Sequence, residues 1–228
     1  MVLEGSGPAP RSRRERPAKA ALTRDGILEA ALGILEEEGI GKVTMRRIAA
    51  ALDTGPASLY VYVRNTEELH AQILDALLAR IAPIPATGSW RERLHAVLTA
   101  YAGVLFAYPE IARLTMTTHP IGPHYFALVE SVLELLAEGG VGDSEAAWAV
   151  DLLLSTVTSN AVEHAAPNAV GEGTDALSDM AARIAAAPPE TYPRIVRLGD
   201  EMLSGTGVDR FSWGLDVLIN GVLSTSRD

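Results

Sequence analysis

VTMRRIAAALDTGPASLYVYVRNTEEL, residues 43–69, contains two short helix patterns separated by a turn. The first predicts a helix over 44–52, whose apolar residues recur at helical spacing: Met45, Ile48, Ala49 and Leu52. Residues 53–55 form the expected turn, and proline at position 56 suits the start of a helix that we expect to run to residue 63. This second helix is small, polar and aromatic rather than rich in leucine. Outward side chains of this kind favour a DNA groove over a protein core.

Helical periodicity continues on both sides of this stretch. One helix is expected to begin near Thr23, which can cap free N–H groups, and to end at Gly39 and Gly41; another, capped by Asn65 or Thr66, spans 66–81. Further helices are expected over 89–107, 109–118, 122–138, 144–165, 174–187, 190–203 and 208–224. No alternating strand pattern or internal repeat is convincing. The prediction is an all-α protein with an N-terminal three-helix helix-turn-helix domain and a larger helical domain.

Charge is distributed unevenly along the chain. The net charge is −10, yet residues 1–80 hold 11 basic and 11 acidic residues, so the whole acidic excess lies in residues 81–228. We expect residues 1–20 to be a disordered basic arm, 21–66 a helix-turn-helix DNA-binding domain, and 67–228 a ligand-binding and dimerisation domain. A solvated tail is the simpler explanation of the arginines, but their position before the helix-turn-helix favours phosphate contact.

Composition and motifs exclude several classes of function. The chain has no cysteine, which excludes disulfides and thiolate metal sites. The N-terminal arginines precede no apolar run, and the longest uncharged stretch, 96–109, has 14 residues, fewer than the roughly 20 that span a bilayer. We therefore expect a cytoplasmic protein without a membrane-spanning segment. The five histidines match no metal-ligand spacing, and no phosphate-binding loop or nucleophile motif occurs, so we expect no metal, no cofactor and no enzymatic activity.

The side chains within residues 44–66 suggest how DNA would be recognised. Arg46 is the only nearby long donor that can bind guanine through two hydrogen bonds, and Ser58 can reach a base edge or a phosphate. Ala57 and Val61 can contact thymine methyl groups. Hydroxyl groups that can reach phosphates belong to Tyr60 and Tyr62.

With these residues in view, the chain resembles a known family. Residues 23–81 resemble the DNA-binding domain of the TetR family of bacterial transcriptional regulators, through ILEAALGILEEEGI, VTMRRIAAAL, ASLYVYV and RNTEEL. Spacing and residue type agree across all four elements. The resemblance implies an all-helical homodimer in which a ligand bound in the C-terminal domain moves two DNA-reading heads apart. The alternative for this region is a helical interaction module that never contacts DNA.

The resemblance also implies roles for single residues. Arg46, Ala57 and Ser58 would be the main base-reading residues, with Pro56 and Val61 nearby. The residues that would contact phosphates are Thr44, Tyr60, Tyr62 and Thr66. Many family members have lysine where Thr66 stands, so one ionic contact with phosphate is missing here. Our hypothesis is that the arginine arm compensates.

The resemblance continues more loosely through the C-terminal part. Residues 108–166 resemble the regulatory domain of tetracycline-repressor-like members, and FSWGLDVLINGVL resembles their last helix, which joins the 144–165 helix in a four-helix dimer interface. Small and apolar residues suited to such an interface are Ala146, Ala147, Ala149, Ser155, Ser159, Trp148, Leu152, Phe211, Trp213, Leu215, Leu218 and Leu223. Packing inside one core explains each of them equally well.

Tetracycline itself does not fit the residues present. By the same match, the two histidines that tetracycline repressors place at a magnesium–drug complex correspond to Thr115 and Ala82, so a metal ligand and a drug contact are lost. We expect a different and more apolar effector. Candidates for its pocket, each also explicable by ordinary packing, are Tyr101, Leu105, Thr115, Met116, Thr118, His119, Phe126 and Glu163.

These observations favour one function and leave two alternatives open. We expect a ligand-responsive DNA-binding regulator, a repressor whose homodimer binds a palindromic double-stranded DNA operator and is released by a small molecule. One alternative is a DNA-binding regulator without a small-molecule effector, whose body serves assembly or a protein partner. The other is an enzyme on a borrowed helical scaffold.

Removing residues 1–20 tests the arm. We expect the truncated protein to bind DNA more weakly and with a shallower dependence of log K on log salt, because fewer counterions are released when fewer phosphates are neutralised. Titrations of both proteins at several salt concentrations measure this slope. An unchanged slope would show that the arm does not contact phosphates.

Overall fold

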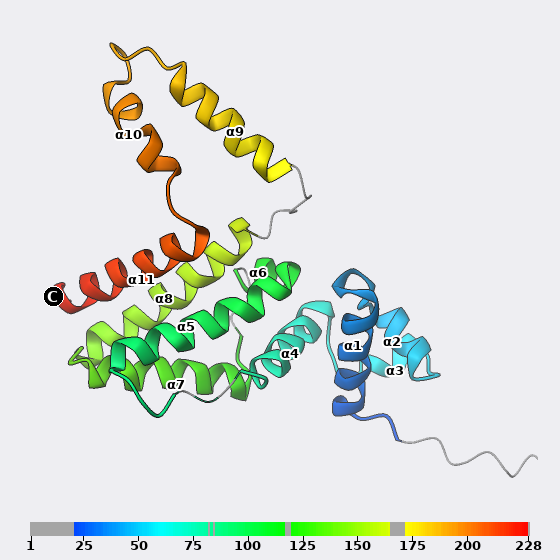
Figure 1. Ribbon diagram of the computed structural model, residues 1–228. Helices are drawn as coiled ribbons and strands as arrows, with labels where there is room; N and C mark the ends of the chain where they lie inside the picture. The colour runs from blue at the N-terminus through cyan, green and yellow to red at the C-terminus, as the bar shows by residue number, and fades with distance from the viewer. Residues whose placement is uncertain (1–20, 82, 84, 117–119, 165–171, 228) are drawn as a thin grey trace, which may run out of the picture.

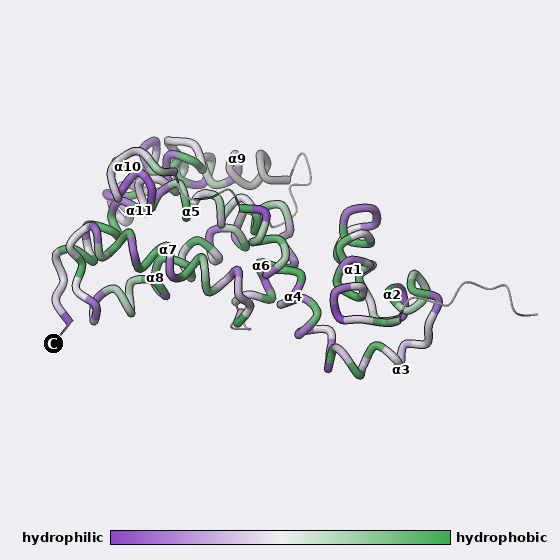
Figure 2. Tube along the Cα trace, turned by 90° about the horizontal axis from the view of Figure 1, so that it is seen from below, coloured by the Kyte–Doolittle hydropathy of each residue, from purple (hydrophilic) through white to green (hydrophobic). Residues whose placement is uncertain are grey.

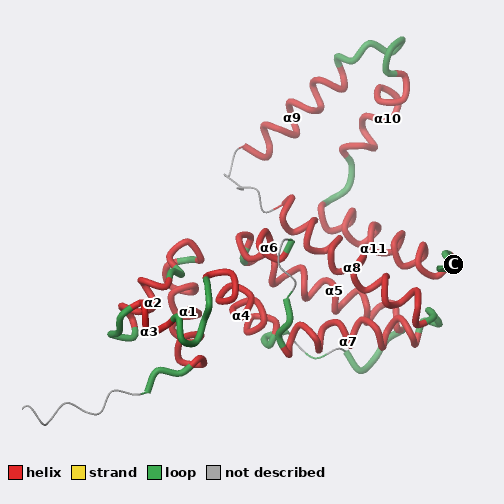
Figure 3. Tube along the Cα trace, turned by 180° about the vertical axis from the view of Figure 1, so that it is seen from behind, coloured by secondary structure: helices red, strands yellow, loops and turns green. Residues whose placement is uncertain are grey.

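The structure is a computed structural model that describes residues 21–227 except 82, 84, 117–119 and 165–171. Its helices are α1 Arg24–Glu38, α2 Met45–Ala51, α3 Pro56–Leu59, α4 Thr66–Leu78, α5 Trp90–Ala107, α6 Pro109–Thr115, α7 Pro123–Glu138, α8 Asp143–His164, α9 Glu172–Ala185, α10 Pro193–Leu203 and α11 Gly207–Ser224, with a short 3-10 turn at Ile40–Lys42. No strand occurs in the part of the chain that is described (Figure 3). The predicted all-α fold is confirmed.

Local caps set where the first helices begin. The side chains of Thr23, Thr44 and Asn65 accept hydrogen bonds from the backbone N–H groups three residues later, at 3.1, 3.2 and 2.8 Å. Each cap satisfies a donor that the helix itself leaves free and contributes about 1 kcal/mol. These three starts lie where the sequence predicted them, because an N-cap depends only on neighbouring residues.

The turn after α2 gives the helix-turn-helix its shape. Asp53 has a φ of 49°, and the N–H groups of Asp53 and Thr54 donate to the carbonyls of Ala50 and Ala49, at 3.2 and 2.8 Å. This is the hydrogen-bond pattern of a Schellman motif, with aspartate rather than glycine in the left-handed position. The backbone therefore reverses direction within residues 52–55.

Helix α3 is shorter than predicted. The sequence indicated a helix running to residue 63, but α3 ends at Leu59 and residues 60–62 form a turn. The Tyr62 and Val63 N–H groups both donate to the Leu59 carbonyl, at 2.9 and 3.0 Å. Alternating tyrosine and valine have low helix propensity, which explains the early end. Leu59 and Val63 are nevertheless fully buried.

The head, α1 to α3, and the body, α5 to α11, lie on either side of α4 (Figures 1 and 2), and the buried apolar residues form one hydrophobic core. The head packs α1 against α2 and α4, and the body packs α5 between α7 and α8, with α6 against α4 and α8. Buried residues of the head include Ile27, Ile34, Ile48, Leu59, Val63 and Leu69, and those of the body include Leu94, Leu98, Leu105, Val132, Leu135 and Val157. Helix α4 therefore connects the head to the body and packs on both.

Helices α9 and α10 pack on each other and extend away from the body (Figures 1 and 3). Helix α11 returns to lie along α8. In the described residues, no single helix is long and apolar enough to cross a membrane; α5 and α6 reach that length and composition only as a pair, bent by 114°.

Candidate DNA-binding surface and effector region

Residues 56–62 form a continuous exposed surface on the head. Pro56, Ala57 and Ser58 are exposed on α3. In the turn that follows, the exposed fractions of Tyr60, Val61 and Tyr62 are 53%, 80% and 37%. Because Leu59 and Val63 anchor this segment in the core, its outward side chains are held on a fixed backbone. Of the residues that the sequence nominated for DNA contact, Ser58, Val61 and Tyr62 line one groove.

Two adjacent arginines at the start of α2 have different roles. Arg47 donates to Glu38 Oε1 on α1, with its Nη2 at 2.5 Å. The hydrogen bond from Arg47 holds the pKa of Glu38 below its ordinary value. Arg46 is exposed and makes no ion pair among the described residues. Arg47 therefore ties α2 to α1, while the guanidinium of Arg46 is available to an anion or a base edge.

A groove of about 660 Å³ runs beside this surface. The residues that line it are Ala21, Leu22, Thr23, Gly26, Leu52, Thr54, Ser58, Val61 and Tyr62. Ala21 is the first described residue, so the chain enters the head next to the candidate recognition side chains. Residues 1–20 themselves, the predicted arm, lie outside the described residues.

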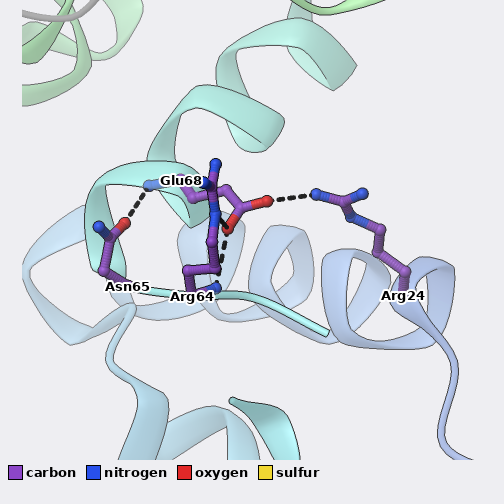
Figure 4. Close-up of polar contacts among 4 residues, drawn as sticks. All are labelled: Arg24, Arg64, Asn65 and Glu68. Atoms are coloured by element: carbon purple, nitrogen blue, oxygen red, sulfur yellow. Dashed lines mark hydrogen bonds and ion pairs between the residues drawn. The ribbon is translucent and has the colours of Figure 1, made fainter. Parts of the chain in front are cut away.

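Glu68 joins the start of α4 to α1 (Figure 4). Its Oε1 accepts a hydrogen bond from Arg24 Nη2 at 2.5 Å, and its Oε2 accepts from the backbone N–H and Nε of Arg64 at 2.8 and 3.1 Å. The N–H of Arg64 contributes most to lowering the pKa of Glu68, helped by the side chain of Arg64 and the charge of Arg24. Thr66, the predicted phosphate contact, is exposed in the same turn.

Asp75 joins the second half of α4 to α7. It is only 9% exposed, and its Oδ1 accepts hydrogen bonds from the backbone N–H groups of His124 and Tyr125 at 3.0 and 2.9 Å. Helix α7 has Gly122 at its N-cap, which has no capping side chain, and Pro123 at its first position, which has no N–H. Asp75 thus supplies from another helix the cap that α7 lacks.

Sequence reasoning missed Asp75. Its position within the apolar stripe of α4, between Leu74 and Leu77, was the available indication, since a carboxylate there needs a partner. The partner could not be identified from the sequence, because it lies about 50 residues away.

The predicted effector residues do not all face one space. Tyr101 and Leu105 are buried on α5, whereas Met116 and Phe126 are 56% and 57% exposed and Glu163 is exposed near the end of α8. Thr115, at the end of α6, donates to the Ile111 carbonyl at 2.8 Å. Thr118 and His119 lie outside the described residues.

A cluster of polar groups inside the body was also not predicted. The hydroxyls of Tyr101 on α5 and Thr158 on α8 are 3.1 Å apart. Because the Thr158 hydroxyl donates to the Leu154 carbonyl, Tyr101 is the donor in this pair. Burial raises the pKa of Tyr101 to about 12, and burial together with the charge of Asp151 raises the pKa of Tyr125. Both phenols are therefore neutral near pH 7, and the Tyr101 hydroxyl joins α5 to α8 through its hydrogen bond with Thr158.

His70 lies where α4 meets α6. It lines a small cleft with Leu114, Thr115 and Pro120, and its Nε2 is buried without a hydrogen-bond partner. Burial lowers the pKa of His70, so its ring is neutral near pH 7. In the described part of the chain, no three histidine or acidic side chains are arranged to hold a metal ion.

Helices α8 and α11 share an exposed apolar face. Its large side chains, with exposed fractions between 42% and 70%, are Trp148, Leu152, Trp213, Val217 and Leu223. The Arg227 guanidinium lies 3.8 Å from the centre of the Trp148 ring. Many large exposed apolar side chains on two adjacent helices favour a protein–protein contact.

Comparison with known proteins identifies the family of this chain. Residues 27–73 match the family model for bacterial regulatory proteins of the tetR family, and residues 82–226 match the model for the tetracyclin repressor-like C-terminal domain. The chain belongs to the TetR family. In this TetR-family regulator, the head and the body thus carry the two parts that the family combines.

Individual relatives agree with the TetR-family assignment along most of the chain. The tetracycline repressor protein class D of Escherichia coli is 31% identical over 209 residues, which cover 89% of each chain. The solved structure of SCO7704 from Streptomyces coelicolor is 44% identical, with a TM-score of 0.77, and covers 92% of this chain and 98% of that one. ActR of Streptomyces coelicolor, in complex with actinorhodin, is 32% identical, with a TM-score of 0.80, over 90% and 97% of the two chains.

Replacing Glu68 tests the connection between α1 and α4. The folded-state pKa of Glu68 lies below its ordinary value of 4.5, so its contribution to stability is complete above that value and is lost as the pH falls through the folded-state pKa. We expect Glu68→Gln to lower the free energy of unfolding at about pH 7 and to differ little from the wild type near about pH 3.

Urea unfolding at both pH values measures this difference. Glu67→Gln is the matched control, because Glu67 is exposed in the same first turn of α4. If both variants lost the same stability at both pH values, the contacts with Arg24 and Arg64 would not stabilise the fold.

Proposed function

We propose that this protein is a ligand-responsive transcriptional repressor, whose homodimer binds a pseudo-palindromic DNA operator through the heads. The observation that carries the proposal is the set of exposed side chains in residues 56–62, together with the exposed Arg46, which makes no ion pair among the described residues, in a chain of the TetR family. Residues 21–66 would bind DNA, and 67–228 would bind the effector and form the dimer. An exposed basic and hydroxyl-rich surface suits a groove and its phosphates.

Each residue of this surface has a proposed role. Arg46, Ala57 and Ser58 would contact base edges, with Pro56 and Val61 beside them. The residues proposed to contact phosphates are Thr44, Tyr60, Tyr62 and Thr66. The hydroxyl oxygen of Thr44 already accepts from the Arg47 N–H, which leaves its hydrogen to donate to a phosphate.

We propose a small-molecule effector other than tetracycline. ActR, at 32% identity, has been solved with actinorhodin and with (S)-DNPA. The proposed pocket includes Tyr101, Leu105, Thr115, Met116, Thr118, His119, Phe126 and Glu163, to which we add the hydrogen-bonding groups of Tyr125 and Thr158. We further propose that the regulator is cytoplasmic and has no enzymatic activity. The acidic body would keep the rest of the molecule from binding DNA non-specifically.

Selection of genomic fragments by the purified protein, followed by footprinting, tests the function. We expect a protected site at moderate salt with two related half-sites at least about 34–36 Å apart, because two heads must meet the same face of the duplex. If the protein protects no site at any salt concentration tested, it is not a DNA-binding regulator.

Arg46→Ala tests the base-reading role on the selected fragment. We expect weaker binding to the operator and a loss of discrimination against base changes in the half-site, by about 1–3 kcal/mol for a bidentate contact. Arg197→Ala is the control, because it removes the same charge from an exposed position on α10. Equal losses for specific and random DNA in Arg46→Ala would reduce Arg46 to a phosphate contact. Fluorescence anisotropy measures both affinities.

Val217→Lys tests whether α8 and α11 form the dimer interface. Val217 is 48% exposed in the single chain, so lysine there is compatible with the fold but would place a charge inside an apolar interface. We expect a monomer by light scattering and much weaker operator binding. Ile121→Lys is the control, because Ile121 is also exposed but lies outside α8 and α11. A dimeric Val217→Lys protein would exclude this face as the interface.

A further inference from the structure

Asp75 and the first turn of α7 form a polar joint inside an apolar environment. In the part of the chain that is described, the buried side chains classed as polar or charged are those of Asp75 and Thr158. A Cβ at Gly122 would overlap the Asp75 carboxyl group, so glycine is required for this close approach. The N–H of Phe126 donates to the Gly122 carbonyl at 3.0 Å. With Pro123 lacking an N–H, Asp75 satisfies the two remaining free donors of the first turn.

Helix α4, which carries Asp75, is also tied to α1 of the head. Glu68, seven residues before Asp75, accepts from Arg24 of α1, and Leu69 and Ile73 are completely buried. Seven residues of α-helix correspond to about 10 Å. Arg80, five residues after Asp75, also pairs with Glu36 of α1, at 2.7 Å, so contacts with α1 lie on both sides of Asp75 along the chain.

The first turn of α7 lies beside the proposed effector region. Phe126 follows the capped residue Tyr125 directly, and Thr115 at the end of α6 lines the same small cleft as Leu74 of α4 and Pro120, which precedes α7. Tyr125 also faces the charge of Asp151 on α8. A ligand that contacts these side chains would therefore push on the turn that Asp75 holds.

We propose that Asp75 is a positioning residue that couples the first turn of α7 to the orientation of the DNA-binding head. Two hydrogen bonds to one carboxylate oxygen tolerate little displacement before they weaken. When the first turn of α7 shifts, α4 either moves with it or leaves a buried carboxylate and two N–H groups without partners, which is unfavourable. The joint itself rests on geometry alone; its use in regulation rests on the function proposed above.

Spin-label distance measurements test the joint without DNA or effector. The chain has no cysteine, so Glu29→Cys on α1 and Glu134→Cys on α7, both exposed, give one label on the head and one on the body. Dilution with unlabelled protein restricts the signal to pairs within one chain. We expect a narrow distance distribution in the otherwise wild-type protein and a broader or shifted one in Asp75→Ala.

Three further variants separate the joint from general destabilisation. Asp75→Asn keeps an oxygen that accepts both N–H groups, so its distribution should stay close to that of the wild type. Gly122→Ala places a methyl group where the Asp75 carboxyl group lies, so the carboxyl group must move away from the first turn of α7. This variant should broaden the distance distribution as Asp75→Ala does. Ser89→Ala removes the N-cap of α5, away from the joint, and should leave the distribution unchanged. A wild-type distribution in both Asp75→Ala and Gly122→Ala would overturn the proposal.

Operator binding tests the regulatory use of the joint. We expect Asp75→Ala to bind the selected operator about fivefold or more weakly than the wild type, with the same salt slope, because Asp75 contacts no phosphate. Asp75→Asn should restore most of the affinity. A broadened distance distribution with unchanged operator affinity would show that the joint exists but does not set the geometry for DNA. If the wild type binds no operator, the proposed function fails, and the distance measurements still decide whether the joint exists.

Discussion

Helix α4 must pack against the head and the body at once, and the rest of the structure depends on this constraint. Its buried apolar side chains form one stripe, Leu69, Ile73, Leu74, Leu77 and Leu78. Helix α4 contacts α1 of the head and α5, α6 and α7 of the body. Complete burial of one leucine or isoleucine contributes about 1.5–3 kcal/mol. The buried side chains of α4 therefore join the head to the body in one core, and the head cannot change its orientation without changing the packing of the body.

Charge explains how an acidic protein can carry a DNA-binding head. Residues 1–80 are neutral in sum, while the entire net charge of −10 lies in residues 81–228. Within the head, acidic side chains are paired with arginines: Glu38 with Arg47, and Glu68 with Arg24 and Arg64. These pairs hold α1, α2 and α4 together. They remove negative charge from the neighbourhood of Arg46 and of the exposed turn that follows α3.

Much of the fold could be predicted because its determinants are local. The caps at Thr23, Thr44 and Asn65 and the turn at residues 53–55 each depend on a few consecutive residues, and each was placed correctly. The length of α3 was wrong because periodicity suggested a full helix where tyrosine and valine favour a turn. At the candidate DNA surface, periodicity was enough to separate buried Leu59 from exposed Ser58. In the effector region it was not, since Phe126 and Leu105 are both apolar and only packing decides which is exposed.

Polar contacts inside the body and between α4 and α7 fix how the helices are positioned against each other, which hydrophobic periodicity could not predict. Apolar side chains pack without strong directionality, so an apolar stripe tolerates a small sliding of one helix along another. The hydroxyl pair of Tyr101 and Thr158 fixes α5 against α8, and the carboxylate of Asp75 fixes α4 against α7. Each is satisfied in one arrangement and costs free energy in others. A structure with few such contacts has few positions at which a bound molecule can change the packing of its helices. Of the two buried polar side chains in the described residues, Asp75 and Thr158, Asp75 is on α4, the helix that also packs against the head.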